Sequence, residues 1–81
     1  MLRALSQLLG SIPDEAGRSE VLQLAREIHE AGRREQGPQR DLEQQQLLHK
    51  MTERLRWHFR SARYALPGPG ELQQMIDEHF R

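Results

Sequence analysis

Apolar residues recur every three or four positions along most of this 81-residue chain, the spacing that places them on one face of an α-helix. No stretch alternates apolar and polar residues over more than a few positions, as a half-buried strand would. Three breaks containing glycine or proline divide the helical pattern into four segments. The sequence therefore predicts an all-α protein, a single helical domain over residues 1–81 with helices at about 2–10, 13–35, 40–66 and 71–80, two of them short and two longer.

The second predicted helix begins with residues that stabilise a helix N-terminus. Ser11 can accept a hydrogen bond from a first-turn amide, and Pro13 has the backbone geometry of a first helical residue. Asp14 and Glu15 follow where the positive end of the helix dipole favours negative charge. We therefore expect Ser11 to be the N-cap of this helix. The alternative cap is Ser19, with the regular part of the helix beginning at Glu20, because Gly17 weakens the first turns.

The third predicted helix, residues 40–66, has an apolar face and a second face that carries aromatic residues. At 100° per residue the apolar face is an arc about 120° wide. It consists of Leu47, Leu48, Met51, Leu55, His58, Phe59, Ala62, Ala65 and Leu66. Trp57 and Tyr64 lie seven residues apart on the opposite side of the helix. This helix should therefore contact the core with one face and either another helix or a binding partner with the other.

Arginine side chains surround the two aromatic residues of that second face. Arg60 is three residues after Trp57 and four before Tyr64, so its guanidinium can lie between both rings. Arg56 and Arg63 flank it on the same side. Because Trp, Tyr and Arg are the residue types most enriched among binding hot spots, these five residues predict a surface for a protein partner. An alternative is that Trp57 and Tyr64 pack beneath the first or last helix of a bundle.

The small size of the chain indicates a second copy as one such partner. A chain this short buries only about 60 to 65% of the surface that its unfolded form exposes. Small cores gain from oligomerisation, and symmetric pairing is the commonest form of it. We therefore expect the helical bundle to be completed by homodimerisation.

Charge is unevenly distributed along the chain, although the formal net charge is zero. Residues 49–63 have a net charge of +4, and the last fifteen residues have a net charge of −2. The cations of residues 49–63 are Lys50, Arg54, Arg56, Arg60 and Arg63, set against Glu53 alone. A basic helix with interleaved aromatic residues can contact phosphates and stack on bases, so a nucleic-acid-binding regulator using residues 49–63 is the alternative function. The zero net charge weighs against it.

Residues that would support catalysis or metal binding are scarce. The chain has no cysteine, which excludes disulfides and thiolate chemistry. Its histidines share no helix face at ligand spacing, its serines have no identifiable base, and no glycine-rich loop follows a strand. No apolar run approaches the roughly 18 residues that a membrane span needs. We therefore expect a cytoplasmic, non-enzymatic adaptor, regulator or assembly factor without cofactor, metal, membrane contact or small-molecule substrate.

Overall fold

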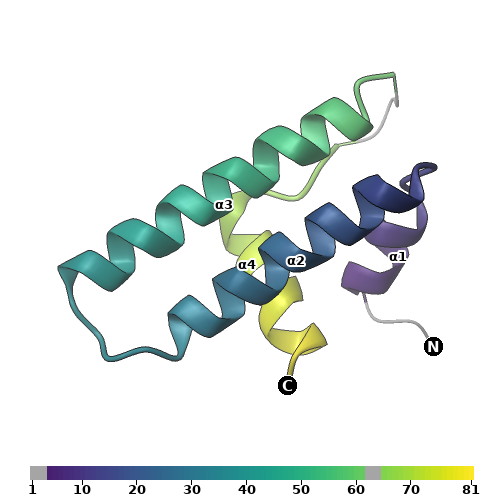
Figure 1. The fold of residues 1–81 in the computed structure, drawn as a ribbon. Coiled ribbons are helices and arrows are strands. Elements are labelled where there is room, and N and C mark those ends of the chain that lie inside the picture. The colour runs from purple at the N-terminus through teal and green to yellow at the C-terminus, as the bar shows by residue number, and fades with distance from the viewer. Residues whose placement is uncertain (1–3, 62–64) are drawn as a thin grey trace.

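The computed structural model describes residues 4–61 and 65–81, and every regular element in these ranges is a helix (Figure 1). The four helices are α1 (Ala4–Gly10), α2 (Glu15–Gly32), α3 (Pro38–His58) and α4 (Pro69–His79). For the described ranges, the predicted all-α fold with four helices is confirmed. None of the helices in these ranges is long and apolar enough to cross a membrane.

α2 and α3 form an antiparallel hairpin, and the two short helices pack against it (Figure 1). α4 crosses the hairpin on one side and contacts the three other helices, while α1 contacts α2 and α4. The core lies between these elements. It contains Leu5, Leu9, Ile12, Val21, Leu24, Ala25, Ile28, Met51, Leu55, Phe59, Leu72 and Ile76.

α4 depends on this packing for its stability. An isolated helix of 11 residues is marginal in water, because nucleation costs more than so few hydrogen bonds return. Leu72 and Ile76, one turn apart, are both fully buried against the other helices. The C-terminal segment is therefore helical because it is docked.

The cap of α2 is Asp14, so the expectation that Ser11 would be the N-cap is wrong. The Asp14 carboxylate accepts hydrogen bonds from the amides of Ala16 at 3.3 Å and Gly17 at 3.2 Å. Ser11 instead donates its hydroxyl to the carbonyl oxygen of Gln7 at 3.1 Å, within the turn that ends α1. The cap lies three residues later because Ile12 must reach the core, where it is fully buried.

Replacing Asp14 with alanine should lower the free energy of unfolding by about 1 kcal/mol, the usual effect of losing an N-cap side chain. Ser11→Ala is the matched control, because Ser11 does not cap α2 and its hydroxyl is exposed. We expect it to stay within about 0.5 kcal/mol of the parent protein. Urea denaturation followed by circular dichroism would measure both, and equal losses would contradict the assignment of the cap.

α3 ends at His58, eight residues before the predicted end of the third helix. Phe59 leaves the helical conformation, with φ −108° and ψ 22°, although its amide still donates to the carbonyl of Leu55. No glycine or proline marks this end, so periodicity alone extended the helix too far. Farther along the chain, Leu66 precedes Pro67, a position that disfavours helix. Of the predicted apolar arc, Ala65 is exposed, Leu66 is half-buried outside any helix, and Ala62 lies outside the described residues.

Candidate functional site

The last turn of α3 presents Trp57 to solvent. Leu55, two residues earlier, is only 1% exposed, and residues two apart on a helix lie about 200° from each other. Packing Leu55 into the core therefore directs Trp57 outward, where its side chain is 54% exposed. Trp57 does not pack beneath α1 or α4.

Arg60 holds the exposed indole from one side. Its guanidinium carbon lies 4.0 Å from the centroid of the Trp57 ring, the geometry of a cation–π contact. One guanidinium nitrogen of Arg60 also donates to the Trp57 carbonyl oxygen at 2.8 Å, and the backbone amide of Arg60 donates to the same oxygen at 3.4 Å. The same arginine thus ends α3 and orders the Trp57 side chain.

Of the other three residues predicted for this surface, the structure describes only Arg56. Arg56 is exposed and pairs with Glu53, one turn earlier, at 3.1 Å. Arg63 and Tyr64 lie outside the described residues, so their part in the surface remains a prediction. We refer to Arg56, Trp57 and Arg60 as the Arg–Trp patch.

A groove adjoins the Arg–Trp patch between α3 and the connection from α3 to α4. Its volume is about 470 Å³. Its walls consist of Gln45, Leu48, His49, Thr52, Arg56, Leu66, Pro67, Gly68 and Pro69. Arg56 belongs to both features, so the groove and the patch form one continuous surface. We refer to the groove as the α3 groove.

Sequence reasoning missed the α3 groove because it placed Leu66 on a continuous helix. The groove exists because the chain leaves the helix before Leu66 and returns beside α3 on its way to α4. Pro67 and Pro69 were visible as helix breakers, but nothing in their spacing indicated that they would lie opposite Leu48 and Thr52. That juxtaposition depends on the crossing of α4.

Leu42 is the other large hydrophobic side chain that is exposed among the described residues, at 56%. It lies on α3 fifteen residues before Trp57, or about 22 Å along the helix axis. The two residues therefore do not form one apolar patch. Leu42 is a useful reference for Trp57, since both are exposed positions on the same helix.

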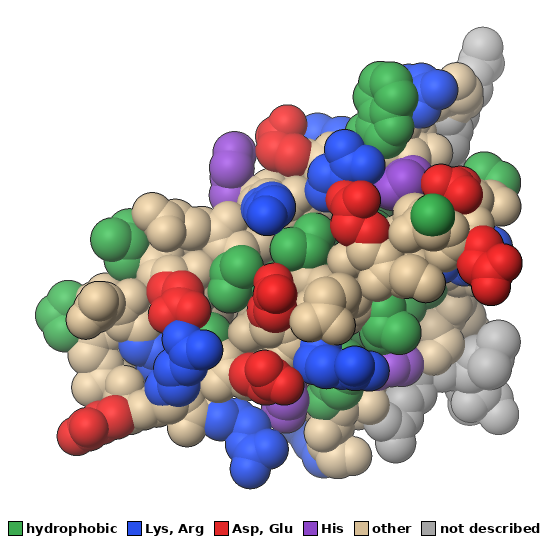
Figure 2. Space-filling model, viewed as in Figure 1, with side chains coloured by type: hydrophobic (Ala, Val, Ile, Leu, Met, Phe, Trp, Pro, Cys, Tyr) green, Lys and Arg blue, Asp and Glu red, His purple; other side chains and the backbone are tan. Residues whose placement is uncertain are grey.

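The surface over the α2–α3 hairpin carries interspersed charges of both signs (Figure 2). Arg34 of the turn after α2 pairs with Glu43 of α3 at 2.6 Å, and Arg54 of α3 pairs with Glu20 of α2. The pair of Arg56 with Glu53 is already included in the net charge of +4 for residues 49–63, and the pair of Arg54 with Glu20 compensates one further positive charge. This face does not carry a field of a single sign.

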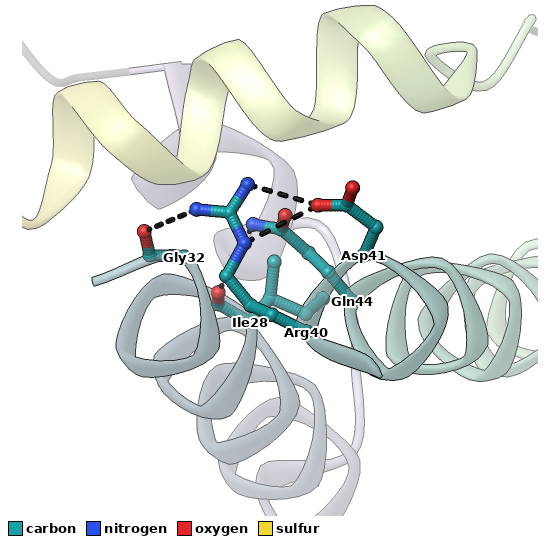
Figure 3. A network of polar contacts seen from close by, with 5 residues as sticks. All are labelled: Ile28, Gly32, Arg40, Asp41 and Gln44. Atoms are coloured by element: carbon teal, nitrogen blue, oxygen red, sulfur yellow. Dashed lines mark hydrogen bonds and ion pairs between the residues drawn. The ribbon is translucent and has the colours of Figure 1, made fainter. Parts of the chain in front are cut away.

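A polar network closes the turn between α2 and α3 (Figure 3). Arg40 donates to the carbonyl oxygen of Gly32 at 3.2 Å and to the carboxylate of Asp41 at 2.9 Å. Gln44 donates to the carbonyl oxygen of Ile28 at 3.4 Å. These side chains satisfy carbonyls at the C-terminal end of α2, where cations are favoured. We therefore assign this network a structural role in the hairpin.

Two of the histidines lie closer together than their spacing in the sequence suggested, but they do not form a metal site. His29 stacks on the ring of Phe80 with centroids 5.3 Å apart, and His79 meets the same ring edge-on at 4.9 Å. His29 also lies 3.7 Å from the carboxylate of Asp77. Within residues 4–61 and 65–81, no group of three potential ligands is arranged to hold a metal ion. The cluster serves to dock the end of α4 against α2.

Comparison of this chain with protein-family models, with curated proteins and with solved structures gave no match. No functional residue is therefore transferred from a relative. Among the described residues, the Arg–Trp patch and the α3 groove combine exposed apolar area with cationic side chains. This combination makes them the candidate functional site.

Proposed function

We propose that this protein is a non-enzymatic interaction module that binds a protein partner through the Arg–Trp patch, acting as an adaptor, regulator or assembly factor. The observation that carries the proposal is the exposed indole of Trp57, 54% accessible and held 4.0 Å from the Arg60 guanidinium. Arg63 and Tyr64, which follow Arg60 closely in the sequence, would extend this surface.

An ordered tryptophan beside an arginine suits a binding anchor on energetic grounds. Trp and Arg dominate binding hot spots because they bury large rigid areas and keep a polar group for pairing. A side chain that is already ordered loses less conformational entropy when a partner covers it. The cation–π contact therefore lowers the entropic cost of binding a partner through Trp57.

Nucleic acid is the alternative partner, and the stacking of Arg60 on an exposed indole also suits it, since bases stack on such surfaces. The zero net charge of the chain and the carboxylates of Glu20 and Glu53 on this face argue against it, because a nucleic acid strand needs several basic side chains along its backbone. We therefore rank a protein partner first. A second copy of this chain is one such partner, and homodimerisation through α3 remains part of the proposal.

Replacing Trp57 with alanine should weaken partner binding at least about tenfold, because truncating a hot-spot anchor costs about 1 to 4 kcal/mol. Leu42→Ala is the matched control, since Leu42 is equally exposed on the same helix but lies outside the patch. We expect it to change affinity less than about twofold. The parent protein and both variants would be used to capture proteins from an extract of the source cells. Candidates would then be purified and their affinities measured by calorimetry.

Two further measurements on the same variants separate the kinds of partner. Light scattering would reveal a dimer, and a dimer that Trp57→Ala dissociates would identify the partner as a second copy. Emission of Trp57, the only tryptophan in the chain, would be followed during titration with mixed-sequence single-stranded DNA. A change that is lost between about 50 mM and about 200 mM salt would favour nucleic acid. Partners that bind the parent protein and Trp57→Ala equally would contradict the proposal.

A further inference from the structure

The α3 groove has apolar walls on two sides. Leu48 of α3 lies on one side, and Leu66 and Pro67 of the connection lie on the other. The volume of about 470 Å³ is within the range of sites that hold ligands, about 300 to 1,000 Å³. A groove of this kind fits a bulky apolar side chain.

Among the described residues, the charged side chain that lines the α3 groove is the cation Arg56. Arg56 and His49 belong to its wall, and no carboxylate does among the described residues. Gly68, the N-cap of α4, also lines the groove and has no side chain to cap the first turn. Glu71 lies in that first turn and offsets the positive end of the α4 dipole, so the positive charge of this edge comes from Arg56. An occupant with negative charge is favoured.

Arg56 is available to such an occupant at small cost. Its ion pair with Glu53 is exposed, with 66% of the Arg56 side chain and 51% of the Glu53 side chain accessible. Exposed pairs of this kind contribute little to stability. A partner carboxylate can therefore take the place of Glu53 beside the guanidinium.

From these contacts we infer that the α3 groove binds an acidic peptide segment that carries a bulky apolar residue. The apolar side chain lies between Leu48 and Leu66, one flanking carboxylate pairs with Arg56, and another accepts a hydrogen bond from the imidazole of His49. The segment belongs to the protein partner that covers Trp57, so this inference rests on the proposed function and adds the chemistry of the partner. Nucleic acid fits the groove less well, because it offers no aliphatic side chain to the apolar walls.

A blocked heptapeptide with leucine at its third and fifth positions and aspartate elsewhere is a suitable probe, carrying a fluorescent label at its N-terminus. Gln45→Glu places a negative charge in the wall of the groove and should weaken binding about threefold to fivefold in fluorescence anisotropy. Gln46→Glu is the matched control, because it makes the same change at the next residue, outside the groove. It should change affinity less than about 1.5-fold.

Two control peptides test the chemistry of the occupant. Replacing each aspartate with lysine, or each leucine with serine, should reduce binding at least about tenfold, because the first removes charge pairing and the second removes apolar burial. Equal weakening by Gln45→Glu and Gln46→Glu, or equal binding of the lysine peptide, would overturn the inference. Dimers that bury the groove and exclude the peptide would also overturn it, since the occupant would then be a second copy.

Failure of this inference is distinguishable from failure of the proposed function. If the peptide does not bind but capture of a protein still depends on Trp57, the inference is overturned, and the Arg–Trp patch is a binding surface for a partner of different chemistry. If the peptide binds in the groove but no captured protein depends on Trp57, the groove is a site in its own right and the patch is not.

Discussion

Replacing Leu55 with alanine should lower the free energy of unfolding by about 3 kcal/mol, because removing a buried leucine side chain loses its apolar burial and leaves a cavity. Leu55 is 1% exposed and belongs to the core that joins the four helices. An 81-residue protein has a total stability of roughly 4 to 12 kcal/mol, so this one change would remove a large part of it. Urea denaturation followed by circular dichroism would measure the loss.

Trp57→Ala is the control for this prediction, since Trp57 is only two residues away on the same helix. It removes a larger side chain, but one that is mostly exposed, and we expect a loss of about 1 kcal/mol or less, including the contact with Arg60. A loss as large as that of Leu55→Ala would mean that Trp57 belongs to the core. The proposed binding surface would then have no anchor.

Replacing Gly17 with valine should also destabilise the protein, by about 2 kcal/mol, because the His58 imidazole of α3 occupies the space that a side chain at Gly17 would need. A Cβ atom at Gly17 would lie 2.9 Å from Nε2 of His58 and closer still to Cε1, nearer than such atoms normally approach. Gly17 is buried in the first part of α2, where the helix passes the end of α3. The imidazole of His58 would have to leave its place against α2, and its packing there would be lost. Thermal denaturation would measure the effect.

Gly10→Val is the matched control, because a Cβ atom at Gly10 meets nothing within 4 Å. We expect it to change stability by less than about 0.5 kcal/mol. Combining Gly17→Val with His58→Ala should recover part of the loss, since the imidazole is the group that the new side chain meets. Absence of any recovery would show that the effect of Gly17→Val comes from another source.

The helical segments could be predicted from the sequence because helix formation is largely a matter of local periodicity. The spacing of Leu72 and Ile76, for example, indicated a final helix with one buried face, and both residues are buried. The same reasoning predicted that Trp57 would lie opposite the core face of its helix and that Arg60 would reach its ring. Each of these inferences uses residues within two turns of one another.

The ends of the helices were predicted less well, because they depend on where the chain must go next. Ser11 and Asp14 are both good N-cap residues, and the burial of Ile12 decides between them. α3 ends without a glycine or proline because the chain must return toward α4, which a continued helix would prevent. Local sequence contains no information about that return.

The α3 groove and the histidine pair around Phe80 were decided by tertiary structure alone. Leu48 and Leu66 line one groove, and His29 and His79 flank one ring, because α4 crosses the α2–α3 hairpin. The sequence by itself determined the helices, their apolar faces and the place of Trp57 opposite the core face of its helix, since these follow from 3.6 residues per turn. The tertiary structure decided that Trp57 is exposed, because none of the other helices in the described ranges covers it. The packing of α4 decided which distant residues meet, because that depends on how the apolar faces of all four helices fit together.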